Sequence, residues 1–93
     1  MKAIAMSSPG GIEVLTLIDT AEPRAATGQV VVEVAAAGVN FMDTGVRRGQ
    51  FWTEMPNPKV LGVEGAGRVL EVGPGVDDVQ PGQRVAWVYA PGR

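Results

Sequence analysis

Glycine and proline interrupt this chain at close intervals, and their spacing limits the possible fold more than any other feature. The 93 residues include 13 glycines and 7 prolines, and valine-rich runs fill the gaps between them. Short β-branched runs bounded by turn residues are typical of strands, because a helix needs a longer uninterrupted stretch. The sequence therefore predicts a mainly β domain, a small barrel or sandwich, in which strands far outnumber helices.

The expected strands can be placed from these runs. They are residues 2–6, 12–18, 29–37, 60–72 and 83–89. The first two should form a hairpin around the turn at 7–11, because the return run alternates polar and apolar side chains. Glu33 interrupts the third run, which indicates either an edge strand or a polar partner for that carboxylate.

One short helix is expected at residues 41–48. Asn40 is a suitable N-cap and Gly49 a suitable stop, although Gly45 weakens the helix by about 1 kcal/mol relative to alanine. The remaining stretches, 19–28, 50–59 and 76–82, contain proline and lack periodicity, so we expect loops there.

Composition excludes several classes of function. Hydrophobic residues make up 45% of the chain and charged residues 19%, which is enough apolar material for one small folded domain. The net charge is −2 and there is no basic block, so nucleic acid is not an expected partner. No signal sequence and no run of about 20 apolar residues is present, so we expect no membrane association and a cytoplasmic location.

Cysteine and histidine are both absent from the sequence. Their absence removes disulfides, thiolate nucleophiles, imidazole bases and the two ligand types on which nearly every zinc site depends.

Glu64 lies among small and apolar residues, so we expect its carboxylate to be at least half buried. Such a group needs a cation or a polar neighbour, and it serves either a structural ion pair or the lining of a ligand cleft. Candidate cations are Arg47, Arg48 and Arg68. The glycines around it, at positions 62, 65 and 67, do not follow the order of a phosphate-binding turn, and they indicate bulges or tight packing in a strand instead.

Two further groups have two interpretations each. Asn40, Phe41 and Asp43 stand where a strand gives way to the helix, so they either cap that helix or line a cleft at the end of a sheet. Phe51 and Trp52 lie in a proline-flanked loop, as core residues or as exposed recognition aromatics. Trp87 and Tyr89, on one face of the last strand, are expected to be packing residues.

Four segments in order carry a resemblance to a known family: PGGIEVL at 9–15, AAGVNFMDTGVRRGQF at 36–51, LGVEGAGRVLEVGPGV at 61–76 and PGQRVAW at 81–87. Together they resemble the N-terminal, GroES-like domain of the medium-chain dehydrogenase/reductase superfamily, and specifically its zinc-independent quinone oxidoreductase branch. The resemblance covers essentially the whole chain and implies a partly open β-barrel with one short helix.

The resemblance also implies that no zinc is bound. In the zinc-dependent branch a catalytic cysteine takes the place of Asn40 and a metal-binding histidine the place of Val63, and this chain has neither. Members of the quinone oxidoreductase branch instead transfer hydride from NADPH to quinones or other conjugated carbonyl compounds, while the protein supplies orientation and a water-poor cleft.

By the same resemblance, the nicotinamide end of NADP(H) lies against one segment of this chain: Asn40, Phe41, Met42, Asp43, Thr44 and Gly45. Asn40 would offer its amide to cofactor or acceptor, and Phe51 and Trp52 would stand at the mouth of the acceptor cleft. Gly45 takes a position where many relatives have tyrosine, which opens the pocket. No residue is assigned a catalytic acid or base role, and Glu64 is assigned a structural one, with Arg47 as its partner.

The family's enzymes bind most of the cofactor through a Rossmann domain that these 93 residues do not contain. We therefore expect residues 1–93 to be one GroES-like domain, incomplete at its C-terminal end, of a longer and homodimeric NADPH-dependent quinone oxidoreductase, with little or no activity alone. The alternatives are an enone or enal reductase of the same superfamily, and a free-standing GroES-like association module without catalysis.

Overall fold

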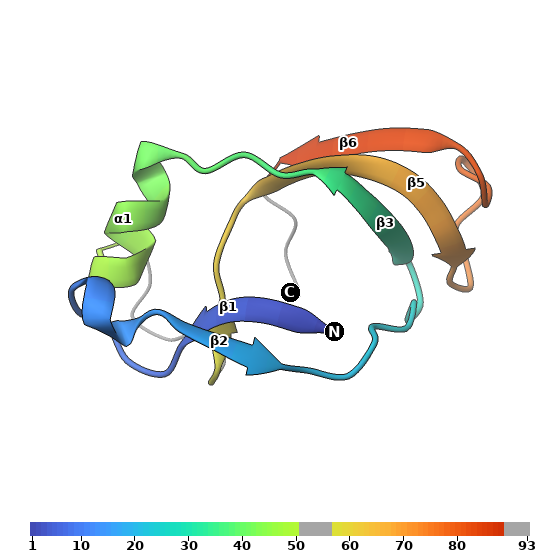
Figure 1. Cartoon of the computed structure of the whole chain (residues 1–93). Coiled ribbons are helices and arrows are strands. Elements are labelled where there is room, and N and C mark those ends of the chain that lie inside the picture. Colours follow the sequence, from blue (N-terminus) through green and yellow to red (C-terminus); the bar gives the residue numbers. More distant parts are fainter. Residues whose placement is uncertain (51–56, 89–93) are drawn as a thin grey trace. The chain divides into compact units, whose positions relative to one another are not determined.

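A computed structural model describes residues 1–50 and 57–88 of the chain (Figure 1). Its elements in chain order are β1 (Lys2–Met6), the 3-10 helix η1 (Ile12–Val14), β2 (Thr16–Asp19), β3 (Val30–Ala36), α1 (Phe41–Arg48), β4 (Lys59–Val60), β5 (Glu64–Val72) and β6 (Arg84–Val88). The strands form two three-stranded sheets. The expected fold class, mainly β with one short α-helix, is confirmed for the described residues.

The chain divides into two compact units, each built from separated segments. The first unit, which we call the helix unit, combines residues 1–21 with 39–63. The second, the sheet unit, combines residues 22–38 with 64–89.

The sheet of the helix unit has the order β2-β1-β4, with β1 antiparallel to both neighbours. The predicted hairpin is confirmed, since Lys2 lies opposite Asp19 and their side chains form an ion pair 2.8 Å long. The return strand is shorter than predicted, because Ile12–Val14 forms a 3-10 turn. The Glu13 carboxylate stabilises that turn by accepting the Gly11 N–H at 3.1 Å.

The helix of this unit has the predicted bounds, and its end follows the local sequence. Gly49 has φ of 82°, a left-handed conformation that glycine adopts without steric cost. Its N–H donates to the Val46 carbonyl oxygen at 3.0 Å, and the Gln50 N–H donates to that of Gly45 at 2.9 Å. These bonds satisfy carbonyl groups that the last helical turn would otherwise leave without donors.

The sheet unit has the strand order β3-β5-β6, again antiparallel (Figure 1). Glu33 on the outer strand β3 is exposed and lies opposite Arg68 on β5, so both the edge position and a polar cross-strand neighbour are found. The expected run 60–72 is divided between β4 and β5, where Gly62 has φ of 109°.

Gly67 explains why β3 and β5 can approach closely. A Cβ atom at this position would overlap the backbone carbonyl oxygen of Glu33 on β3. The tight-packing interpretation of the glycines at 65 and 67 is therefore confirmed, and both residues lie inside a strand rather than in a phosphate-binding turn.

Among residues 1–50 and 57–88, the fully buried apolar side chains are few and unevenly divided. Of these, Ala5, Met6 and Val46 belong to the helix unit and Val69 to the sheet unit; each is 1–2% exposed. Of the helices in residues 1–50 and 57–88, none has the length and apolar character needed to cross a membrane.

Candidate functional site

The segment from Asn40 to Gly45 forms the N-terminal half of α1 and is held by its own side chains. The Asn40 N–H donates to Oδ2 of Asp43 at 2.9 Å, and the Asp43 N–H donates to the Asn40 carbonyl oxygen at 2.9 Å. Asp43 therefore stabilises the helix start in the manner of a capping box. The capping interpretation of Asp43 is confirmed, and the cleft-lining interpretation stays a prediction.

The side chains of this segment differ in what they offer to a ligand. Phe41 is 88% exposed and Val39 93%, so two apolar side chains stand in solvent at the helix start. The Thr44 hydroxyl donates to the Phe41 carbonyl oxygen at 2.7 Å, which leaves its oxygen as an acceptor. Gly45 is buried.

Asp43 also carries a buried acceptor. Its Oδ1 atom is out of contact with solvent and has no hydrogen-bond partner among the residues that the structure describes. A buried carboxylate oxygen without a donor is costly, so this atom is a place where a further donor would stabilise the segment.

Arg47 ties the other end of α1 to the turn at residues 7–11. Its Nε donates to the Gly10 carbonyl oxygen at 3.2 Å, and its own carbonyl oxygen accepts the Gly10 N–H at 2.9 Å. This contact anchors the helix that carries the candidate site. The pairing of Arg47 with Glu64 stays a prediction.

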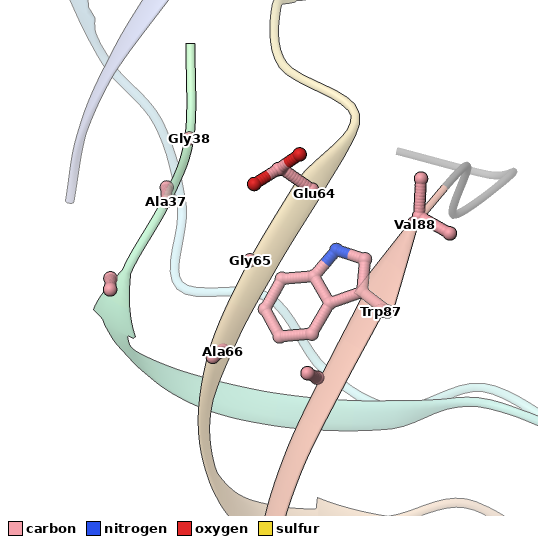
Figure 2. A pocket seen from close by; sticks show the side chains of 9 residues that line it. Ala37, Gly38, Glu64, Gly65, Ala66, Trp87 and Val88 are labelled. Atoms are coloured by element: carbon pink, nitrogen blue, oxygen red, sulfur yellow. The ribbon is translucent and has the colours of Figure 1, made fainter. Parts of the chain in front are cut away.

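Glu64 lies at the start of β5 and is half-buried, as expected from its apolar surroundings. It lines an open pocket of about 630 Å³ within the sheet unit, together with Trp87 on β6 (Figure 2). Small side chains form the remaining walls, among them Ala36, Gly38 and Ala86. The sequence did not predict that Trp87 faces Glu64 across one pocket, because that relation depends on strand register.

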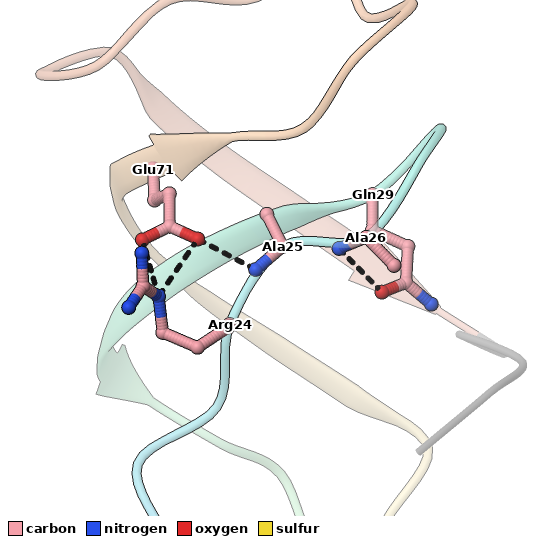
Figure 3. A network of polar contacts seen from close by, with 5 residues as sticks. All are labelled: Arg24, Ala25, Ala26, Gln29 and Glu71. Atoms are coloured by element: carbon pink, nitrogen blue, oxygen red, sulfur yellow. Dashed lines mark hydrogen bonds and ion pairs between the residues drawn. The ribbon is translucent and has the colours of Figure 1, made fainter.

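The sheet unit holds a polar network that sequence reasoning missed (Figure 3). The Glu71 carboxylate, at the end of β5, accepts the Ala25 N–H at 2.6 Å and Nε of Arg24 at 3.0 Å. The Ala25 N–H and, to a smaller degree, the Arg24 guanidinium lower the pKa of Glu71 below its ordinary value of about 4.5. The network fastens the loop before β3 onto the sheet.

Phe51 and Trp52, the expected aromatics at the mouth of the acceptor cleft, lie outside the described residues, as does Tyr89. The remaining site candidates, Asn40 to Gly45, lie together because they are contiguous. Within residues 1–50 and 57–88, no three or more acidic side chains gather closely enough to hold a metal ion.

Comparison with known proteins shows similarity to oxidoreductases. The alcohol dehydrogenase GroES-like domain family matches residues 26–92. Quinone oxidoreductase 1 of Escherichia coli is 41% identical over 81 residues, which are 87% of this chain and 24% of that protein. The crystal structure of E. coli quinone oxidoreductase complexed with NADPH superposes with a TM-score of 0.88 at 34% identity, covering 97% of this chain and 27% of that one.

Other relatives have different activities in their names. The polyketide synthase GfsB of Streptomyces halstedii is 47% identical over 91 residues, 96% of this chain and 2% of that protein. An acryloyl-coenzyme A reductase of Metallosphaera sedula is 39% identical over 93 residues, 98% of this chain and 27% of its own length. A class-3 alcohol dehydrogenase of Cereibacter sphaeroides is 38% identical over 89 residues, which are 96% of this chain and 23% of that protein. The chain spans about a quarter or less of these relatives.

Proposed function

Because the chain belongs to the alcohol dehydrogenase GroES-like domain family of the medium-chain dehydrogenase/reductase superfamily, we propose that it is the catalytic-domain portion of an NADPH-dependent quinone oxidoreductase. The parent enzyme would transfer hydride from NADPH to a quinone or related conjugated carbonyl compound without zinc. Residues 1–93 would constitute one GroES-like domain of that enzyme and would be inactive alone.

The observation that carries the zinc-independent assignment is the identity of two residues. Positions 40 and 63, where zinc-dependent members have cysteine and histidine, are Asn and Val here, and the 93 residues contain no cysteine or histidine at all. An amide and an alkyl group are not zinc ligands of the kind that catalytic sites use. The donor set therefore does not fit a zinc ion, and we assign no step to one.

The cofactor would supply the hydride, so the chain's own residues would orient the nicotinamide and the acceptor and shield them from water. We assign the nicotinamide-facing wall to Asn40 through Gly45, and the structure offers two supporting features. The exposed Phe41 ring is available to cover an apolar face. Asp43 and Thr44 fix the helix start, so the wall is preorganised.

Asn40 is the proposed polar contact to the carbonyl of the acceptor or cofactor, through its side-chain amide. Phe51 and Trp52 are proposed to border the acceptor cleft. Glu64 keeps a proposed structural role, with Arg47 as its partner, and replacement by glutamine in the full-length enzyme should then impair folding or activity.

A second acceptor class is favoured by one relative and one residue. The acryloyl-coenzyme A reductase acts, by its name, on an alkene conjugated to a thioester carbonyl. Quinones and acryloyl thioesters both present a carbon–carbon double bond in conjugation with a carbonyl group. By the resemblance, Gly45 takes a position where many relatives have tyrosine, and the missing ring would widen the range of acceptors, so an enone or enal is the alternative substrate.

A chimera tests the proposal. Residues 1–93 would replace the matching N-terminal quarter of E. coli quinone oxidoreductase 1, and the folded chimera would be assayed with NADPH and 1,4-benzoquinone. We expect quinone reduction, with Asn40→Ala raising KM or lowering kcat at least tenfold. Reduction of an enone in preference to the quinone would favour the alternative acceptor, and oxidation of alcohols that needs added zinc would refute the proposal.

We further propose a cytoplasmic location and a homodimeric parent. The competing possibility, a free-standing association module, makes a different prediction for the purified 93-residue chain. Light scattering coupled to size-exclusion chromatography would give a tight, concentration-independent dimer for a module, whereas a monomer that self-associates with rising concentration supports a catalytic-domain portion.

A further inference from the structure

The contact between Arg47 and the turn at residues 7–11 fixes one end of the helix that carries the candidate site (Figure 1). Arg47 binds the same residue, Gly10, twice: its carbonyl oxygen accepts the Gly10 N–H at 2.9 Å, and its Nε donates to the Gly10 carbonyl oxygen at 3.2 Å. The Arg47 side chain is half-buried at this contact. Two bonds to one residue restrain both distance and direction, so the end of α1 is held in one orientation on the turn.

The turn that receives these bonds is itself restrained. The Val14 N–H donates to the Gly11 carbonyl oxygen at 3.2 Å. A Cβ on Gly10 would stand 2.6 Å from Cγ1 of Val14, so η1 packs closely on the backbone of Gly10. Pro9 packs on the end of α1, because a Cβ on Gly49 would stand 3.0 Å from Cγ of Pro9. The turn is therefore a restrained support for the last turn of α1.

The short helix carries this restraint to its other end. Asn40 and Arg47 are seven residues apart, which corresponds to about 10 Å of helix. The hydrogen bonds of Asp43 at the start of α1 and of Gly49 at its end keep these residues helical. A tilt at Arg47 therefore displaces Asn40, and a displacement of about 1 Å at a reacting centre can lower a rate about 100-fold.

We propose that Arg47 is a positioning residue for the hydride transfer. By holding α1 on the turn at residues 7–11, it sets where the proposed wall, Asn40 through Gly45, meets the nicotinamide, and it acts through the helix rather than by contact with the cofactor. This inference rests on the proposed function. Because a Rossmann domain would hold most of the cofactor, loss of the Arg47 side chain should slow the hydride step far more than it weakens NADPH binding.

The experiment measures the hydride step in the chimera with NADPH and 1,4-benzoquinone. Arg47→Met keeps an alkyl stem and the backbone bond but removes the Nε donor. We expect kcat to fall about tenfold while KM for NADPH changes less than about twofold. The isotope effect on kcat with NADPH deuterated at C4 should rise, because hydride transfer becomes rate-limiting.

Two further variants grade the effect. Arg47→Lys can still donate to the Gly10 carbonyl oxygen, although through a more flexible chain, so kcat should fall only about threefold, with a smaller rise in the isotope effect. Arg48→Met removes an equal charge from the exposed neighbouring position and should change neither quantity. If Arg47→Met fails to fold, the isotope effect of Arg47→Lys decides.

Arg47 is also the proposed partner of Glu64, so Arg47→Met is repeated in the Glu64→Gln chimera. There it should again lower kcat about tenfold, because the bond to Gly10 does not involve Glu64. Disappearance of the effect in that background, an unchanged isotope effect in the Arg47 variants, or an equal effect of Arg48→Met would overturn the proposal. Less folded protein with the same turnover per folded molecule would also overturn it, because Arg47 would then be structural only. A parent chimera that folds but does not reduce the quinone would overturn the proposed function, and this inference with it.

Discussion

Different kinds of internal contact stabilise the helix unit and the sheet unit. In the helix unit, Met6 and Val46 are 2% exposed, so its stability depends on packed side chains. In the sheet unit Val69 is the one described apolar side chain that is fully buried, and the unit relies on close backbone approach at Gly67 and on polar links at its loop. Replacing a glycine by a larger residue should therefore destabilise the sheet unit most, and shortening a buried side chain should destabilise the helix unit most.

The largest effect is expected from Gly67→Val in the sheet unit. The new side chain would overlap the Glu33 carbonyl oxygen, and β3 would have to move away from β5. We expect a loss of about 3 kcal/mol or more in the free energy of unfolding, measured by urea denaturation. Ala86→Val, at an exposed position of β6, is the control and should change stability by less than about 0.5 kcal/mol. Similar values for the two variants would contradict the close-approach account.

Met6→Ala should produce the next largest effect, this time in the helix unit. Removing a side chain that is 2% exposed leaves a cavity and should cost about 2–4 kcal/mol. Amide exchange then distinguishes the units: protection should fall more for β1 and α1 than for β5. An equal fall in both would mean that the two units unfold as one, and the distinction between them would be lost.

Asp43→Ala should have a moderate effect confined to the helix start. It removes the acceptor of the Asn40 N–H and should cost about 1 kcal/mol, read from thermal denaturation by circular dichroism. Asp43→Asn removes the charge but keeps one side-chain oxygen that can accept the Asn40 N–H. Its stability therefore shows whether the charge or the hydrogen bond stabilises the helix start. Retention of stability in Asp43→Ala would show that the cap does not support α1.

The smallest effect is expected at Glu71, and it should depend on pH. The pKa of Glu71 is lowered in the folded chain, mainly by the Ala25 N–H. A carboxyl group with a lowered folded pKa adds stability above its unfolded pKa, and that stability is lost as pH falls through the folded pKa. Glu71→Gln should therefore be less stable than the unmodified chain at pH 7, and the difference should shrink as pH falls from about 4.5. A difference that is constant with pH would rule out the carboxylate as its source.

Local signals explain what the sequence could predict. The helix at 41–48 and its end at Gly49 depend on neighbours in the chain, so their residue types were sufficient. The 3-10 turn at Ile12–Val14 was missed because the alternation of polar and apolar residues from 12 to 18 also suits a strand. The hydrogen bond between the Gly11 N–H and the Glu13 carboxylate, which stabilises that turn, cannot be inferred from the pattern of polar and apolar residues.

Contacts between distant residues could not be predicted in the same way. Arg24 and Glu71 are 47 positions apart and both carry ordinary surface charges, so no pattern links them. The packing of Trp87 on Gly65 depends on the register between β5 and β6, which a shift of one residue would abolish. The strand-to-helix junction indicated only Asn40, Phe41 and Asp43, as capping or cleft residues; the wider segment 40–45 follows from the family resemblance and stays a prediction.

The most direct test of the central claim, hydride transfer without a metal, is the rate of the chimera after complete removal of metal ions. Dialysis against a strong chelator should leave NADPH-dependent benzoquinone reduction unchanged, with less than one equivalent in ten of zinc detected per chain. A rate that collapses on dialysis and returns when zinc is added would contradict the assignment.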